Sequence, residues 1–438
     1  MKWFTVKPSP TAWPTEVPAL RLLEAPPRLR VPLLSHPGAE PPLSKPAGSL
    51  VAKGEVLCSA GSRVALSPIS GRVIGTGTVQ LLNGFTVPAV DIEADFEDRA
   101  LPGESHDAAH AHDQRDEMEH LDRAGPADLA VWIDRLQNAG VWAERPGSPD
   151  LMAQLHGALR QPVDTLICNL LDDEPTMRLN SVLAGRVGPM MLAGVGLIAA
   201  LTGAKRVCLM VEAGSPGRWW VGLRRLARKA KYEMIPIVND YPQADASLLI
   251  LALLGRRLKP GRSPVEQKAL VLDAAAAVAV GRCAIRARPM LQMPVAIRDH
   301  IRHDTHFVLA PIGMSLRQIL QQCDIPTEHV HYRRGAVLRE NEVRADAVVA
   351  GGELTVHVMP EMRVSAPDPC IRCSWCAESC PTNVQPAGLL EAAQINDLEL
   401  AKQYGLDSCI ECGVCSYMCP SRLPLLEGIR TLKNVESP

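Results

Sequence analysis

The stretch CIRCSWCAESCP at residues 370–381 holds four cysteines in the spacing C-x2-C-x2-C-x3-C and closes with a proline. The stretch CIECGVCSYMCP at residues 409–420 repeats this pattern, and we refer to the two as the first and the second cysteine run. In bacterial two-cluster ferredoxins three cysteines of such a run bind one iron–sulfur cube, and the fourth binds the other. The repeat therefore predicts two [4Fe–4S] clusters that transfer single electrons. The expected ligands are Cys370, Cys373, Cys376 and Cys419 for one cluster, and Cys409, Cys412, Cys415 and Cys380 for the other.

Two other uses of these cysteines fit the spacing less well. Structural zinc sites need only C-x2-C pairs, without a third and fourth cysteine ahead of a proline. Disulfide geometry is difficult between cysteines so close in sequence. The chain also opens with MKWFTVKPSPTAWP, which lacks the apolar core of a secretory signal. We therefore expect a reducing, cytoplasmic setting.

Apolar residues in the two runs are expected to form a dry layer around the clusters, because solvent exposure and hydrogen bonds to sulfur help set cluster potentials. These residues are Ile371, Trp375, Ile410, Val414 and Met418. None of them is an acid or a base, so no catalytic residue is predicted here.

Composition and pattern divide the rest of the chain. The 438 residues are 47% apolar, which suffices for about three or four domains, and the net charge of −2 gives no sign of a nucleic-acid partner. The most apolar run, residues 182–204, contains Arg186, Pro189 and five glycines, so it predicts a buried helix rather than a membrane span. The expected fold is multidomain α+β. Its predicted segments are an extended N-terminal segment (1–30), a barrel-sandwich, lipoyl-like β module (31–100), a hydrophilic linker (101–126), an α/β domain with a parallel sheet (127–290), a small β-grasp domain (291–360) and a helical two-cluster ferredoxin domain (361–438).

The order of these segments resembles the C subunit of the Rnf electron-transport complex. It is also similar to the flavoprotein subunit of respiratory complex I and to the cobalamin reductase of propanediol-utilisation compartments. Besides the cysteine runs, the motifs that carry the resemblance are SHPGAEPPLSKPAGSLVAKGEVL (35–57), DTLICNLLDDEP (164–175) and Tyr-Pro-Gln (241–243). The resemblance covers nearly the whole chain. It implies a Rossmann-like domain that binds FMN and takes hydride from NADH, an SLBB-like β-grasp domain, and redox partner proteins in a complex of several subunits. It also implies peripheral attachment, through partners, to the cytoplasmic face of the inner membrane.

The chain departs from that family at the glycine-rich loop, whose pattern is close to G-x-G-G-A-G-F-P-T. The corresponding residues 139–155 read AGVWAERPGSPDLMAQL, with Trp142, Glu144 and Arg145 where glycines are required. Side chains there would take the space of the flavin ring or phosphate. This loop argues against binding of FMN and NAD(P)H.

A second flavin-binding motif of the family has a pattern close to N-x-D-E-x-E-P. This chain retains only part of that pattern. The resemblance implies Asn169, Asp172, Asp173 and Glu174 as flavin contacts, with Leu171 in place of the first acid. The alternative is a turn and helix cap after a strand, which Asn and Asp favour. The altered glycine loop favours this alternative.

Two further groups have ordinary explanations. Basic residues form either solvated helix faces or a docking surface for an acidic partner; they are Arg224, Arg225, Arg228, Lys229 and Lys231, then Arg256, Arg257, Lys259 and Arg262. Isolated cysteines in apolar surroundings are expected to be buried; they are Cys58, Cys168, Cys208, Cys283 and Cys323.

Three functions compete. The leading hypothesis is an electron-transfer subunit that relays electrons through both clusters between partner proteins. The second is an FMN-containing NAD(P)H dehydrogenase subunit that feeds the same clusters. The third is a docking scaffold with structural or sensory clusters.

Overall fold

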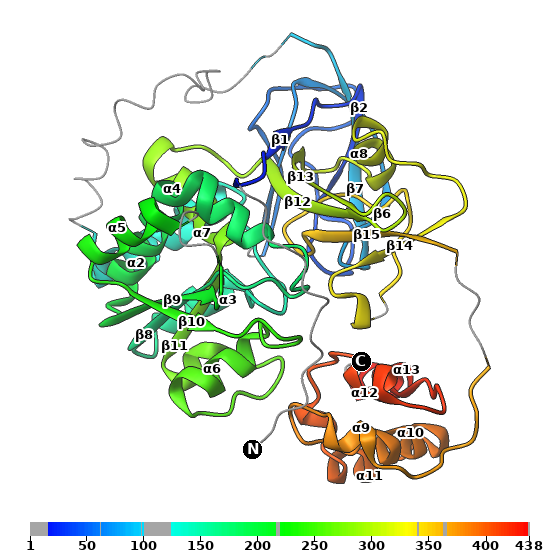
Figure 1. Cartoon of the computed structure of the whole chain (residues 1–438). Coiled ribbons are helices and arrows are strands. Elements are labelled where there is room, and N and C mark those ends of the chain that lie inside the picture. Colours follow the sequence, from blue (N-terminus) through cyan, green and yellow to red (C-terminus); the bar gives the residue numbers. More distant parts are fainter. Residues whose placement is uncertain are drawn as a thin grey trace.

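The computed structural model describes residues 16–61, 63–97, 99, 124–215, 220–339, 341–361 and 366–436, and the structural statements below concern these residues. Most of the predicted linker 101–126 lies outside them. Figure 1 shows three β-containing parts above a helical C-terminal part, which holds both cysteine runs.

The N-terminal β module contains an antiparallel sheet in the order β2-β7-β6-β3, next to a β4–β5 hairpin. Short apolar strands between glycine turns are therefore present as predicted. Its strands are β2 (Arg28–Pro32), β3 (Leu50–Val51), β4 (Val56–Ala60), β5 (Arg63–Leu66), β6 (Gly71–Gln80) and β7 (Thr86–Ala94).

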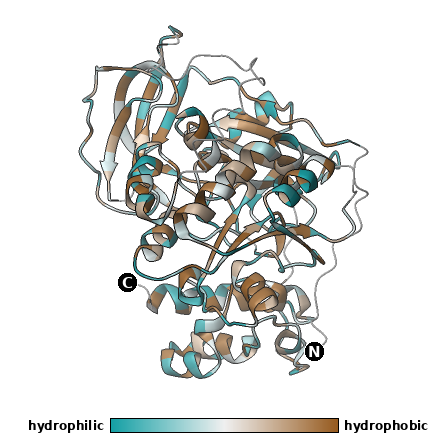
Figure 2. Ribbon diagram, turned by 90° about the vertical axis from the view of Figure 1, so that its left-hand side faces the viewer, coloured by the Kyte–Doolittle hydropathy of each residue, from teal (hydrophilic) through white to brown (hydrophobic). Residues whose placement is uncertain are grey.

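The α/β part contains a parallel sheet in the order β10-β9-β8-β11, as the strand–helix alternation predicts. Successive residues of β8 point to opposite faces, so Leu166 and Cys168 join one apolar core and Ile167 joins another. Helix α6 packs on the Ile167 face, and α4 and α7 pack together on the other. The strands at the centre of the molecule are mostly brown in Figure 2. The elements are α2 (Leu129–Asn138), α3 (Leu151–Ala158), β8 (Thr165–Asn169), α4 (Leu179–Thr202), β9 (Arg206–Glu212), α5 (Val221–Lys229), β10 (Glu233–Ile237), α6 (Ala246–Leu254), β11 (Ala269–Asp273) and α7 (Ala274–Arg286).

Helix α4, with 24 residues, is the longest helix of the α/β part. It is the one helix of the described residues that is long and apolar enough to cross a membrane, but 61% of its most apolar window is buried inside the protein. It is kinked at Val187, two residues before Pro189. A Cβ on Gly194 would lie 2.0 Å from the carbonyl oxygen of Ala277, so α4 and α7 touch through glycine. The prediction of a buried core helix is confirmed.

A five-stranded sheet in the order β1-β13-β12-β15-β14 follows. Its edge strand β1 (Arg21–Leu22) comes from the segment predicted to be merely extended, and it pairs with β13 in parallel. The N-terminal segment thereby satisfies backbone groups that the edge of β13 would expose. The other elements are β12 (Gln292–Asp299), β13 (Asp304–Pro311), α8 (Leu316–Gln322), β14 (Val330–Arg334), a short 3-10 turn η4 (Val337–Arg339) and β15 (Thr355–Pro360).

The C-terminal part is helical. Residues 386–403 form two helices rather than one, because Asn396 adopts a left-handed φ of 53° and Asp397 caps the next helix. The elements are α9 (Trp375–Glu378), α10 (Pro386–Ile395), α11 (Leu398–Gln403), α12 (Val414–Met418) and α13 (Leu425–Glu436).

Candidate iron–sulfur site

The two cysteine runs fold alike. In each, the second and fourth residues after the first cysteine have positive φ: Arg372 (52°) and Ser374 (64°) in the first run, Glu411 (53°) and Gly413 (79°) in the second. These left-handed residues curl the backbone, and each run then enters a short helix, α9 or α12. The two helices pack against each other, so the runs face one another.

The cysteine side chains divide into two neighbourhoods. Burial raises the pKa of the Cys415 thiol, and negative charge on Cys412, Cys409 and Cys380 raises it further. Cys380 belongs to the first run, but it packs against the apolar cluster that contains Cys409 and Cys415 of the second run.

The reciprocal neighbourhood lies around Cys376. Burial raises the pKa of the Cys376 thiol, and charge on Cys419 and Cys373 adds to the effect. Cys419 of the second run thus lies beside the first. The predicted ligand sets require such an exchange of fourth cysteines between the two runs.

The chemistry of the donor set suits iron–sulfur clusters. All thirteen cysteines are free thiols. The backbone amides of Val384 and Glu411 donate to the sulfurs of Cys380 and Cys409, each at 3.4 Å, which are the amide–sulfur bonds that help set a cluster's potential. Within the described residues, no three or more His, Cys, Asp or Glu side chains gather around a single ion. A cube differs from a single ion because each of its cysteines binds a separate iron.

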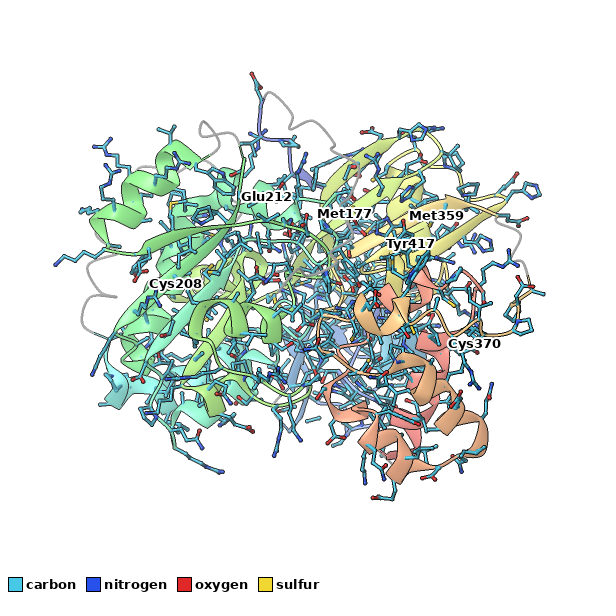
Figure 3. The ribbon with its side chains drawn as sticks, turned by 60° about the horizontal axis from the view of Figure 1, so that its bottom comes forward. Met177, Cys208, Glu212, Met359, Cys370 and Tyr417 are labelled. Atoms are coloured by element: carbon cyan, nitrogen blue, oxygen red, sulfur yellow. The ribbon has the colours of Figure 1, made fainter. Side chains whose placement is uncertain are left out.

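The expected dry layer forms around only one run. Ile410 is 7% exposed and Val414 is 1% exposed, as predicted. The prediction is wrong for Ile371 and Trp375, which are 67% and 51% exposed. The second run is covered by Tyr241, Leu248 and Ala336 from other parts of the chain, whereas Cys370 of the first run lies on the outer side of the C-terminal part (Figure 3).

A buried arginine connects the second run to the α/β part. The guanidinium of Arg339 donates to both carboxylate oxygens of Asp173 at 3.0 and 3.1 Å, and to the carbonyl oxygens of Ile410 at 2.9 Å and Glu411 at 3.2 Å. Tyr241 donates its hydroxyl to the carbonyl oxygen of Cys412 at 2.5 Å. Three successive carbonyls of the second run are therefore capped by side chains from elsewhere.

A second set of charges comes from α13. The ammonium of Lys433 contacts the carbonyl oxygen of Cys409 at 2.6 Å and the carboxylate of Glu411 at 2.9 Å. Burial opposes ionisation of Glu411, but Lys433 and Arg430 together hold the pKa of its carboxyl below its usual value. Arg339 opposes the burial that raises the pKa of Cys412 to about 12. Lys433 likewise opposes the burial that raises the pKa of Cys409, so basic side chains act on two thiols of the second run.

The candidate flavin residues are occupied by contacts within the protein. Asn169 is fully buried; its amide nitrogen donates to the carbonyls of Gly147 at 3.1 Å and Ala244 at 3.0 Å, and its oxygen accepts from the amide of Leu171. Asp172 accepts from the amide of Asn180 in α4 at 3.0 Å.

The two remaining acids lie against η4. Asp173 pairs with Arg339, as described above, and Glu174 accepts from the amide of Val337 at 3.2 Å and from Thr176. Burial raises the pKa of the Glu174 carboxyl. The arrangement is a turn and helix cap, together with one contact that joins the α/β part to η4. No polar atom of Asn169 remains for a flavin.

The altered glycine loop is packed onto the sheet. Arg145 forms a buried ion pair with Asp273, which caps α7, with one nitrogen–oxygen distance of 2.6 Å, and it donates to the carbonyl of Gly351 at 2.9 Å. Trp142 lies under the guanidinium of Arg63 at 4.5 Å, and Glu144 contacts His36 at 3.2 Å. The side chains expected to displace a flavin therefore do fill this region.

A cavity of about 690 Å³ lies between the α/β part and the second run. Its walls include Arg145, Asp245, Arg334, Arg339, Cys409 and Lys433. The sequence gives no sign that Arg339, Arg430 or Lys433 belongs to the site, because no local motif surrounds them. Tyr241 belongs to the Tyr-Pro-Gln motif, which does not indicate its contact with the second run.

Other predicted residues fall where expected. Cys58, Cys168, Cys208 and Cys323 are buried, and Cys283 is half-buried. On α5, Arg224, Arg225 and Arg228 are exposed while Leu223 is buried, which is an ordinary solvated helix face. Lys259 instead contacts Asp407 of the C-terminal part at 3.4 Å.

Two family models match parts of this chain. The model of the Nuo51 FMN-binding domain matches residues 151–282, and the model of the 4Fe-4S dicluster domain matches residues 369–424. The first match begins beyond Trp142, Glu144 and Arg145. The structure of an NAD+-reducing [NiFe]-hydrogenase in the H2-reduced state matches with a TM-score of 0.49 and 15% identity, over 72% of this chain and 64% of that one.

The fold and the paired cysteine runs define an iron–sulfur electron-transfer subunit. As the sequence motifs predicted, the chain is similar to proteins named as the C subunit of ion-translocating oxidoreductase complexes. The Rhodobacter capsulatus protein is 27% identical over 94% of this chain and 79% of its own length. The Edwardsiella ictaluri protein is 26% identical over 96% of this chain, which spans about half (52%) of that longer protein.

Proposed function

We propose that the chain relays single electrons between partner proteins, with two [4Fe–4S] clusters held by crossed ligand sets. The sets are Cys370, Cys373, Cys376 and Cys419, and Cys409, Cys412, Cys415 and Cys380. The observation that supports the proposal is that Cys380 and Cys419 both pack against the apolar cluster that contains Cys409 and Cys415, with Cys380 coupled by charge to Cys415, and Cys419 to Cys376. When bound, such clusters accept and release single electrons. The chain's own residues ligate them, bury them unequally and place charge beside one of them.

The unequal burial supports two different points of access. The first run is open to a partner protein, since its residues Ile371 and Trp375 are exposed. The second run is closed to a large partner, but Cys409 borders the cavity of about 690 Å³. Electrons would therefore pass between the exposed run and whatever group reaches the cavity.

The second candidate is an FMN-containing NAD(P)H dehydrogenase subunit. It is favoured by the match of residues 151–282 to an FMN-binding domain. It is opposed by the engaged polar atoms of Asn169 and by the Arg145–Asp273 pair. We therefore place the source of electrons on a partner rather than on a flavin held by Asn169, Asp172, Asp173 and Glu174.

The named modules and the setting are also proposals. We assign residues 31–100 to a barrel-sandwich module, 127–290 to a Rossmann-like domain, 291–360 to an SLBB-like β-grasp domain and 361–438 to the ferredoxin domain. The relatives' name supports a place in a multi-subunit oxidoreductase complex. Peripheral attachment at the cytoplasmic face of a membrane is proposed from the resemblance alone.

The test is anaerobic purification, with iron, sulfide and flavin measured on one sample, followed by NADH titration watched by visible absorbance. A relay predicts about eight irons, no flavin and no bleaching by NADH. Stoichiometric FMN with bleaching would establish the second candidate instead. Cys373→Ala and Cys412→Ala separate a relay from a scaffold: a relay loses electron flux while assembly persists, and a scaffold keeps its flux.

A further inference from the structure

A second cavity, of about 520 Å³, lies between the helix pair α4–α7 and the five-stranded sheet. None of its lining residues belongs to the cysteine region. Its walls are mainly apolar and include Leu20, Leu183, Met190, Val278, Met293 and Leu309. Its wall on α4 includes the kink at Val187. Cavities of this size and character hold drug-sized apolar ligands.

The polar lining of this cavity is of one sign. Five lining residues are basic and, among the described residues that line it, none is acidic; the basic ones are Lys53, Arg186, Arg282, Arg286 and Arg288. The guanidinium of Arg186 is already engaged, because it donates to the carbonyl oxygens of Val17 and Pro18. The charge that remains for a ligand is therefore on the α7 side.

Arg282 gives the strongest indication that this cavity binds an anion. It is half-buried, and its side chain makes no hydrogen bond or ion pair with any residue that the structure describes. Burial lowers the pKa of its guanidinium, and the like charges of Arg288 and Arg286 lower it further. Holding a cation in this position costs free energy unless an anion joins it.

The dipole of helix α7 can account for the position of Arg286 but not for that of Arg282. Arg286 lies in the last turn of α7, where a cation interacts favourably with the helix dipole. Arg282 lies one turn earlier and faces Arg286 rather than an acid. The dipole therefore does not account for a cluster of guanidinium groups at the mouth of an apolar cavity.

We propose that this cavity binds an anionic amphiphile, with its carboxylate or phosphate on Arg282 and Arg286 and its apolar body between α4, α7 and the sheet. Planar guanidinium groups suit both headgroups, because they can donate two parallel hydrogen bonds. The tail would cover apolar side chains such as Met190, Val278 and Met293. The ligand's source is either a free long-chain acid or a membrane lipid.

The direct test is fluorescence titration of the complete, cluster-loaded chain with cis-parinaric acid. Saturable binding of about one equivalent is expected. Arg282→Leu should weaken it at least tenfold, Arg282→Lys should weaken it less, and Val278→Trp should abolish it by filling the cavity. Arg224→Leu, on the exposed face of α5, is the matched control and should bind as the parent does. Circular dichroism and the visible cluster absorbance establish that each variant is folded.

Competition distinguishes the charge from the apolar body. Palmitate should displace the probe at least tenfold better than hexadecanol, which has the same chain length and no charge. Equal binding by the parent and Arg282→Leu, or equal displacement by acid and alcohol, would overturn the proposal. These readouts do not depend on electron transfer, so they stand apart from the relay hypothesis.

Sedimentation with phosphatidylglycerol vesicles identifies the source. Vesicle binding that Arg282→Leu abolishes would assign the site to a membrane lipid. Saturable binding of palmitate without vesicle binding would assign it to a free acid. Equal vesicle binding by the parent and Arg282→Leu, together with no saturable binding of cis-parinaric acid, would refute the site.

Discussion

The guanidinium of Arg339 lies 2.9 Å from the carbonyl oxygen of Ile410, inside the second cysteine run. A positive charge held there stabilises the reduced, more negative form of an adjacent cluster. Arg339→Met should therefore lower the midpoint potential of one cluster and leave the other nearly unchanged, as measured by redox titration followed by electron paramagnetic resonance.

A matched control removes the charge of Arg339 together with that of its partner Asp173. Arg339→Met should also destabilise the fold by about 3–5 kcal/mol, because Asp173 is left buried and unpaired. In Arg339→Met/Asp173→Asn the net charge is conserved, so the potential should return toward the parent value. Equal shifts of both clusters would show that Arg339 does not act locally.

The exchange of fourth cysteines makes a separate prediction. Cys380→Ser should alter the spectrum of the cluster held by Cys409, Cys412 and Cys415, and Cys419→Ser should alter that of the other cluster. Cys283→Ser, outside both runs, serves as the control and should leave both spectra intact. If Cys380→Ser instead perturbs the cluster of Cys370, Cys373 and Cys376, each run binds its own cube.

Gly413 should tolerate no side chain. Its φ is +79°, and an added Cβ would meet the carbonyl oxygen of Leu338 at 1.7 Å. Gly214 has a similar φ of +82°, but nothing lies within 4 Å of an added Cβ. A substitution there therefore measures the cost of backbone strain without a steric clash. Gly214→Ala should cost about 1–2 kcal/mol. Gly413→Ala should cost more and should also lower the iron content, and equal costs would contradict the close packing of η4 on the second run.

His357 predicts a dependence of stability on pH. Its ring is fully buried, with one nitrogen 3.0 Å from the carbonyl oxygen of Gly335 and the other 2.9 Å from His300. Burial, with the nearby His300, lowers its pKa from 6.5 to about 3. The unfolded chain takes up this proton below pH 6.5, while the folded chain takes it up only near pH 3. Stability should therefore fall by about 1.4 kcal/mol per pH unit between these values.

Urea unfolding at about pH 7.5 and about pH 5.5 checks this. The parent should lose about 1.4 kcal/mol more than His357→Gln on acidification, because glutamine retains a donor for Gly335 and has no proton to gain. Equal losses would mean that His357 titrates normally.

Features encoded by neighbouring residues are predictable from the sequence, and contacts between distant segments are not. The parallel sheet and the buried helix within 182–204 both follow from local apolar patterns. Ile371 and Trp375 were expected to be buried because their run resembles the second one, yet only the second run is covered by other parts of the chain. Arg339 contacts Asp173 and Ile410 across 166 and 71 residues, and no local signal encodes such a contact.

The pairing of β1 with β13 has a consequence for biosynthesis. Arg21 lies opposite Val308, so 287 positions (308 minus 21) separate the two partners along the chain. At about 5–20 residues per second, a ribosome needs about 15–60 s to deliver the second strand after the first. During that interval β1 has no β13 to pair with, and the cysteine runs are synthesised later still. The thiols of both cysteine runs, which follow β13 in the chain, therefore become available to iron and sulfide only after both strands of this pair have been synthesised.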